Sequence, residues 1–225
     1  MRMMLYAGKG GVGKTCVAGA TGIITARKGL KTLVMSLDPA HSLSDAFDLD
    51  RSLMDKNRGQ PIQAEDNLWV QELDVHEEIN NYWSEVHGYI SLLLNTSGID
   101  DVLAEELAVL PGMEELSALL YINKYVKDQL YDVIVLDCAP TAESIRFISM
   151  PTALEWYMKK VFRLEWKIFG YVRPVARWMV DIPLPEVEYF ANIESLYTRL
   201  KGVEQLLTDP EITSVRLVTN PEKMV

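Results

Sequence analysis

A glycine-rich loop near the start of the 225-residue chain restricts the fold more than any other feature. Residues 8–15 read GKGGVGKT; an apolar run at 3–7 precedes them, and a segment of small and apolar residues follows, up to Gly29. This order predicts a buried strand, a loop and a helix. The loop fits GxxxxGK[ST], in which backbone N–H groups and a helix N-terminus surround phosphate oxygens.

The phosphate-loop interpretation makes every position of the loop, and the residue after it, a nucleotide contact. These positions are Gly8, Lys9, Gly10, Gly11, Val12, Gly13, Lys14, Thr15 and Cys16. Lys14 would reach the β- and γ-phosphates, and the hydroxyl of Thr15 would hold Mg²⁺. Lys9 would add a second positive charge where negative charge develops during phosphoryl transfer. We also expect the Cys16 side chain to lie on a buried helix face.

The same loop contains GxGxxG, the fingerprint of dinucleotide-binding folds, and Asp38 stands where a ribose-binding acid would lie. That alternative gives Lys14 no role and does not explain a second acid, Asp137, at the end of another strand. The phosphate loop is therefore the favoured hypothesis. Tight NADH binding without ATP binding would reverse it.

Five apolar runs predict strands, and the segments between them are rich in helix-forming residues. The runs lie at residues 3–7, 33–37, 68–73, 131–137 and 215–219. Strands that alternate with helices predict a parallel sheet with right-handed crossovers. We therefore expect an α/β fold of the P-loop NTPase type in one domain, residues 1–225, with helical insertions at about 76–130 and 151–207. A break falls at 111–112, and we expect the natural protein to continue beyond residue 225.

Asp38 and Asp137 each follow an apolar strand. Ligands of parallel sheets bind beyond the carboxyl ends of the strands, so both acids would face the phosphate loop. Acids at this position are expected of a site for Mg²⁺ and a nucleotide. The alternative is that each acid caps only the turn that follows it.

The amino-acid composition argues against several classes of protein. The chain carries 22 Lys and Arg against 32 Asp and Glu, a net charge of −10, which argues against whole-surface binding to nucleic acid or anionic membrane. Its two cysteines, Cys16 and Cys138, cannot form a disulfide framework and fit a reducing compartment. No signal peptide and no run of 18 apolar residues is present, so we expect a cytoplasmic protein, peripheral at most to a membrane.

Four segments together resemble one known family: GKGGVGKT at 8–15, DPAHSLSDAF at 38–47, LPGMEE at 110–115 and DCAPTAES at 137–144. The chain is similar to the arsenical pump-driving ATPases and to their relatives that target tail-anchored membrane proteins. Both belong to the deviant Walker A class, marked by a second lysine inside the loop.

The resemblance implies roles for individual residues. Lys9 matches the lysine that reaches a nucleotide across a homodimer interface, and Lys14 and Thr15 match the phosphate and Mg²⁺ contacts. Asp38 matches the residue that polarises the attacking water. Asp137 matches the acid that holds Mg²⁺ through water. His41, Asp45 and Pro140 match the two switch segments.

The chain also departs from that family. Cys138 replaces a threonine in the second switch, and Ala142 and Glu143 replace a Gly-His pair. Two cysteines cannot build the three-cysteine metalloid site, which puts arsenite activation in doubt. The CxxC zinc clasp of the targeting branch is also absent from these residues, and the family's adenine contacts come largely from later segments.

Residues 151–180 form a basic, aromatic segment, with six cations against two acids and seven of the chain's 20 aromatic residues. One interpretation is a helical subdomain that packs its own core. The other is a groove for a hydrophobic client helix or a surface for lipid headgroups, which the resemblance favours.

The sequence therefore predicts a Mg²⁺-dependent, homodimeric ATPase that couples ATP binding and hydrolysis to a helical surface for a client or a membrane-protein partner. A nucleotide-gated binding scaffold with little turnover is a second hypothesis, and a chromosome-partition type of ATPase is a third. No nucleic-acid partner is expected.

Overall fold

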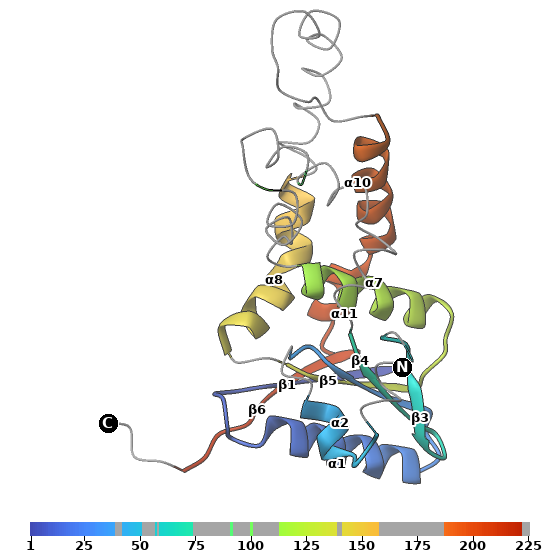
Figure 1. Ribbon diagram of the computed structural model, residues 1–225, viewed down its shortest axis with the longest axis vertical. Coiled ribbons are helices and arrows are strands. Elements are labelled where there is room, and N and C mark those ends of the chain that lie inside the picture. Colours follow the sequence, from blue (N-terminus) through green and yellow to red (C-terminus); the bar gives the residue numbers. More distant parts are fainter. Residues whose placement is uncertain are drawn as a thin grey trace, which may run out of the picture.

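The computed structural model describes residues 1–38, 42–50, 57, 59–73, 91, 100, 113–138, 141–157 and 187–221. Within these ranges, six strands form one sheet in the order β3-β4-β2-β5-β1-β6 (Figure 1). The strands are β1 (Arg2–Ala7), β2 (Thr32–Ser36), β3 (Ile62–Glu65), β4 (Leu68–Glu72), β5 (Val133–Asp137) and β6 (Thr213–Leu217). All neighbours pair in parallel except β3 and β4.

The central strands end together at one edge of the sheet. Asp137, the last residue of β5, pairs with Tyr6 of β1 on one side and with Ser36 of β2 on the other. Ser36 pairs in turn with Glu72, the last residue of β4. The carboxyl ends of four parallel strands therefore lie next to the loop that follows β1.

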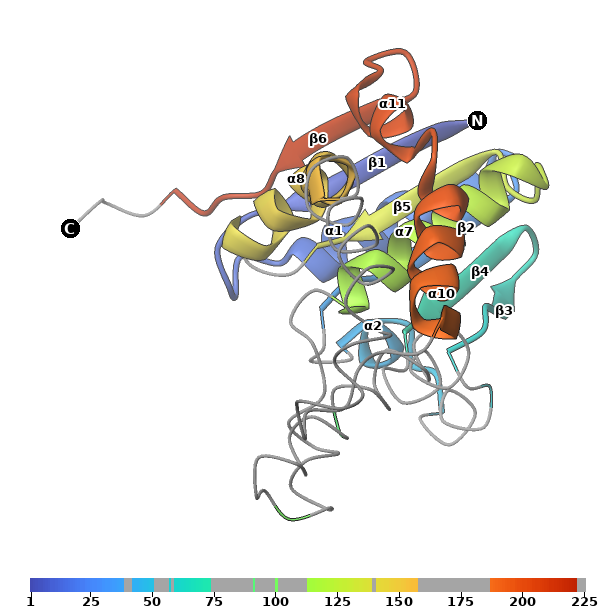
Figure 2. The same ribbon diagram turned by 90° about the horizontal axis from the view of Figure 1, so that it is seen from above.

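Helices cover both faces of the sheet (Figures 1 and 2). One face carries α1 (Lys14–Arg27), and α2 (Ser42–Ala46) packs against α1 and β4. The opposite face carries α7 (Met113–Lys127), α8 (Thr141–Tyr157), α10 (Val187–Leu200) and α11 (Val203–Thr208). In Figure 1, α8 and α10 extend away from the sheet, whereas α1 and α7 lie along it.

The helices on the two faces bury different kinds of side chain. On the α1 face the helix buries small residues, among them Ala18, Gly22 and Ala26. A Cβ added at Gly22 would lie 2.3 Å from a methyl group of Val34, so the helix backbone approaches β2 very closely. The other face is filled by large side chains, whose fully buried members include Leu119, Ile122, Leu136 and Phe147.

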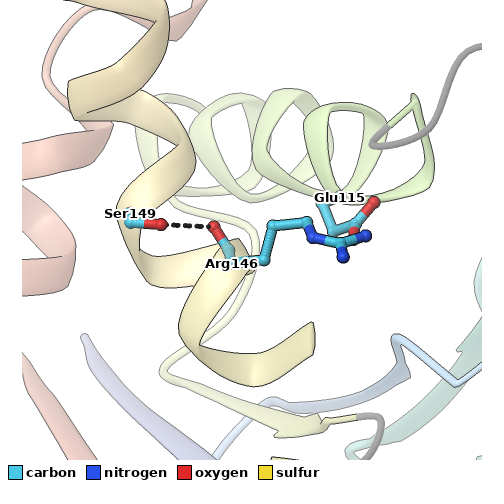
Figure 3. A network of polar contacts seen from close by, with 3 residues as sticks. All are labelled: Glu115, Arg146 and Ser149. Atoms are coloured by element: carbon cyan, nitrogen blue, oxygen red, sulfur yellow. Dashed lines mark hydrogen bonds and ion pairs between the residues drawn. The ribbon is translucent and has the colours of Figure 1, made fainter. Parts of the chain in front are cut away.

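Helices α7 and α8 are also connected at the surface. Figure 3 shows Arg146 of α8 extending toward Glu115 of α7, with 3.9 Å between Nη1 and Oε1. The Ser149 hydroxyl donates a hydrogen bond to the Arg146 carbonyl oxygen, 3.1 Å away, one turn along α8.

The predicted α/β fold with a largely parallel sheet is confirmed, and each predicted strand lies within two residues of an observed one. Two short elements were missed, the antiparallel strand β3 and the helix α2. Helix α7 begins directly after the predicted break at 111–112. Most of the predicted helical insertions, residues 76–90 and 158–186 in particular, lie outside the described residues, and the division into domains stays a prediction. No helix in the described ranges combines the length and apolar character needed to cross a bilayer.

Candidate nucleotide site

The loop between β1 and α1 has a backbone that requires glycine. Gly11 and Gly13 have φ angles of 76° and 89°, a region that other residues rarely adopt. Gly8 lies against the end of β6: a Cβ added there would be 2.3 Å from the carbonyl oxygen of Val218. The start of the loop thus lies against the backbone just after β6, with no space for a side chain at Gly8.

Lys14, the first residue of α1, is buried, with 7% of its surface exposed. Its ammonium group donates a hydrogen bond back across the loop to the carbonyl oxygen of Lys9, 3.3 Å away. The Lys9 residue itself is exposed. One lysine of the motif is therefore drawn into the loop, and the other is accessible from solvent.

Asp137 is almost fully buried at the end of β5, with 1% of its surface exposed. Within the part of the chain that the structure describes, neither of its carboxylate oxygens makes a hydrogen bond of normal geometry. Burial raises the pKa of this carboxyl group above its ordinary value. The Thr15 hydroxyl and the Lys14 ammonium group oppose that shift in pKa, and the negative charge of Asp38 adds to it. The structure thus brings the predicted acids Asp38 and Asp137 close to Lys14 and Thr15.

The described residues of the segment that begins at Asp38 lie beside the loop. The Asp38 N–H group donates a hydrogen bond to the Ser36 hydroxyl, 3.1 Å away, which fixes the start of the segment at the end of β2. In α2, the hydroxyl of Ser42 lies 3.3 Å from that of Thr15. Asp45 lies in the same helix and is exposed.

One prediction about the loop is wrong. Cys16 was expected on a buried helix face, yet it is exposed in the first turn of α1. The buried stripe of α1 follows Lys14, Ala18 and Gly22 at intervals of four residues, and Cys16 falls between these positions. His41 and Pro140, the other predicted switch residues, lie outside the described residues, as does most of the basic, aromatic segment.

Sequence reasoning also missed residues at this edge of the sheet. Glu72 is buried at the end of β4 and accepts a hydrogen bond from the backbone N–H of Ser44, 2.7 Å away. The predicted strand ended one residue later, at Leu73, so Glu72 did not read as an acid at a strand end. Ser42 and Ser44 gave no signal beyond their place in the DPAHSLSDAF segment.

The donor set suits a magnesium ion. The Thr15 hydroxyl and the Asp137 carboxylate are oxygen donors, which Mg²⁺ prefers. The described ranges contain no group of three His, Cys, Asp or Glu side chains that could hold a metal alone. Mg²⁺ is ordinarily bound by one or two carboxylates together with water and substrate phosphates, so a single buried acid beside a phosphate loop fits. The Asp137 oxygens, which have no hydrogen bond of normal geometry in the part of the chain that the structure describes, are the observation that favours a cation here.

The fold and this loop define a nucleotide-binding protein of the P-loop class. A family model described as "Anion-transporting ATPase" matches residues 1–225, and the chain belongs to that family. This confirms the resemblance drawn from the motifs.

Similar proteins agree with that family. Over its whole length the chain is 53% identical to a protein of Aquifex aeolicus named arsenical pump-driving ATPase 1, and 36% identical to a protein of that type from Chlorobaculum tepidum. It is 29% identical, over 99% of its length, to an ATPase ASNA1 homolog of Entamoeba histolytica, and it covers 68% of that protein. The chain spans 57% and 55% of the first two relatives, little more than half of each.

Proposed function

We propose that this protein hydrolyses ATP in a Mg²⁺-dependent reaction. The observation that carries the proposal is the buried Asp137, whose carboxylate oxygens make no hydrogen bond of normal geometry among the described residues and lie beside Lys14 and Thr15. A charged group in such a place costs free energy unless a ligand compensates for it. Membership in a family of ATPases supports the same conclusion.

The residues of the site have separate roles in the proposed reaction. The N–H groups of residues 8–15 and the ammonium group of Lys14 bind the phosphates. Thr15 and Asp137 would hold the Mg²⁺ ion, which when bound offsets charge on the β- and γ-phosphates. Asp38 orients the water that attacks the γ-phosphate in line with the leaving oxygen. Lys9, exposed in the loop, supplies its charge to the nucleotide of a second copy in a homodimer.

We further propose that the site is coupled to the helices on the other face of the sheet. Helix α8 begins four residues after Asp137, so a displacement at the metal site is passed directly to it. Helix α8 contacts α7, α10 and α11, and with α10 it extends beyond the sheet (Figure 1). These helices would carry the surface for a hydrophobic client helix or a membrane-protein partner in the cytoplasm. Loss of the γ-phosphate is the event that would change this surface.

The test is a comparison of Asp38→Asn with the intact wild-type protein. The variant should bind MgATP with nearly unchanged affinity but lose at least about 100-fold in kcat, because only the orientation of the water is lost. Asp128→Asn is the matched control, since Asp128 is exposed after the end of α7. Unchanged hydrolysis by Asp38→Asn would reject the role of Asp38, and binding without turnover in the wild type would favour the binding scaffold.

A further inference from the structure

A second buried acid lies at the edge of the sheet that carries the nucleotide site. Glu72 is the last residue of β4 and is 8% exposed. It pairs in register with Ser36, which pairs with Asp137. Glu72 is thus two strands away from Asp137 in the same row.

The carboxylate of Glu72 holds the backbone of α2. Its Oε1 accepts a hydrogen bond from the Ser44 N–H group at 2.7 Å, and both residues are buried. Hydrogen bonds to an ionised acceptor are shorter and stronger than neutral ones. Helix α2 has only five residues, too few to be stable without tertiary contacts. Its position therefore depends on anchors such as this one.

The other side of α2 faces the phosphate loop and its helix. The Ser42 hydroxyl lies 3.3 Å from the hydroxyl of Thr15. The Phe47 ring, just after α2, lies against Gly19 of α1, where an added Cβ would be 3.3 Å from it. The helix thus bridges Glu72 on β4 and the Thr15 end of α1.

We propose that Glu72 is a positioning residue of the nucleotide site. It fixes α2 through the Ser44 N–H group, and thereby fixes the Ser42 hydroxyl beside Thr15 and the end of the segment that starts at Asp38. This inference rests on the proposed ATPase function. Loss of the carboxylate should impair turnover more than binding, because Glu72 accepts a hydrogen bond from α2, whereas the loop N–H groups and Lys14 bind the phosphates.

A purely structural role would give a different result, and the neighbouring residue provides the control. Gln71 is also fully buried on β4, and its side chain bonds to the Gly59 carbonyl oxygen and the Tyr125 hydroxyl, away from α2. Gln71→Ala removes buried hydrogen bonds from the same strand without changing an anchor of α2. If Glu72 only stabilises the fold, the two substitutions should affect turnover alike.

The experiment measures kcat, the Kd for MgATP and the melting temperature of Glu72→Ala, Glu72→Gln and Gln71→Ala in the intact protein. Glu72→Ala should lower kcat by about tenfold or more and change Kd by less than about threefold, the size expected for one hydrogen bond to a charged acceptor. Glu72→Gln keeps an acceptor oxygen and should recover most of the rate. Gln71→Ala should lower the melting temperature and leave kcat unchanged.

A kcat for Glu72→Ala within twofold of the wild type, or an equal loss in Gln71→Ala, would overturn the inference. Hydrogen exchange of the nucleotide-free protein separates this outcome from a failure of the proposed function. If the wild type does not hydrolyse ATP, the function fails, yet Glu72→Ala should still speed exchange at the Ser44 amide and Gln71→Ala should not. Equal exchange in the two variants would reject the anchor itself.

Discussion

The two faces of the sheet are built on different principles. On one face, α1 lies so close to β2 that only glycine fits at position 22, and the phosphate loop begins at its first turn. On the other face, α7 and its neighbours are separated from the sheet by large side chains such as Leu119 and Phe147. Backbone-to-sheet packing leaves little freedom, whereas a layer of large side chains can be repacked at small cost.

The two faces therefore suit different tasks. The α1 face suits groups that must be held in fixed positions, and the other face suits groups that must move. The loop must hold its N–H groups in fixed directions, and a helix seated directly on the sheet provides that. The helices on the other face extend past the sheet (Figure 1), where the proposed coupled surface would have to move. Substitutions on both faces test this comparison.

The largest effect is expected at the start of α1. Lys14→Ala should abolish ATP hydrolysis, with a loss of about 1,000-fold or more in kcat, because the substitution removes a buried cation from the phosphate site. Steady-state ATPase assays of the intact protein measure it. Lys124→Ala on α7, an exposed lysine on the other face, is the matched control. Equal ATPase activity in the two variants would show that the nucleotide site does not lie on the α1 face.

Gly22→Ala should destabilise the fold by about 1–2 kcal/mol, although alanine is the better helix former. The added methyl group would collide with the stiff, β-branched Val34. Leu119→Met, a swap of similar volume on the other face, should cost less than about 1 kcal/mol. Urea unfolding of both variants compares the faces directly. A larger loss in Leu119→Met would contradict the account.

Asp137→Asn should stabilise the nucleotide-free protein by about 1 kcal/mol while it weakens MgATP binding. The substitution removes a buried charge that has no hydrogen bond of normal geometry among the described residues. Thermal unfolding without nucleotide measures the first effect, and titration with MgATP the second. Loss of stability together with unchanged MgATP affinity would contradict a metal role for Asp137.

The same carboxyl group predicts a pH dependence. Burial raises the pKa of Asp137 in the folded protein above its ordinary value of 3.8, so the folded state keeps a proton that the unfolded state releases. The free energy of unfolding should therefore fall as the pH rises from 3.8 through the raised pKa, and remain reduced above it. Asp137→Asn should lack this component. Wild-type and variant stability curves of the same shape would show that Asp137 titrates normally.

The smallest effect is expected at the surface between α7 and α8. Arg146→Ala should change the free energy of unfolding by less than about 0.5 kcal/mol, because the side chain is more than half exposed and its ion pair with Glu115 spans 3.9 Å (Figure 3). Urea unfolding at low and at high salt measures it. A loss above about 1 kcal/mol would mean that this ion pair, rather than the large buried side chains, holds the second face together.

The parts of the structure that long apolar runs and glycine spacing encode could be predicted from the sequence. The central strands β1, β2 and β5 are continuous apolar runs because helices bury them on both sides, and Asp137 stood out as the acid that ends the strongest run. Strand β3 was missed because its four residues, IQAE, lie at the edge of the sheet and alternate between half-buried and exposed. An edge strand of this kind carries little apolar signal.

Contacts between segments that are far apart in the chain could not be predicted from the sequence. Nothing local marks Glu72 as the partner of the Ser44 amide, 28 positions away, because the pairing depends on the order of the strands. The exposure of Cys16 likewise depends on which side of α1 rests on the sheet. The phosphate loop needed no such information, since one segment supplies its glycines, its lysine and its hydroxyl.

The most direct test of the central claim is calorimetric titration of the intact protein with ATP in the presence and absence of Mg²⁺. We predict one nucleotide bound per chain, an affinity at least about tenfold lower without Mg²⁺, and little effect of Mg²⁺ on Asp137→Asn. No heat of binding, or the same affinity with and without Mg²⁺ in the wild type, would contradict it.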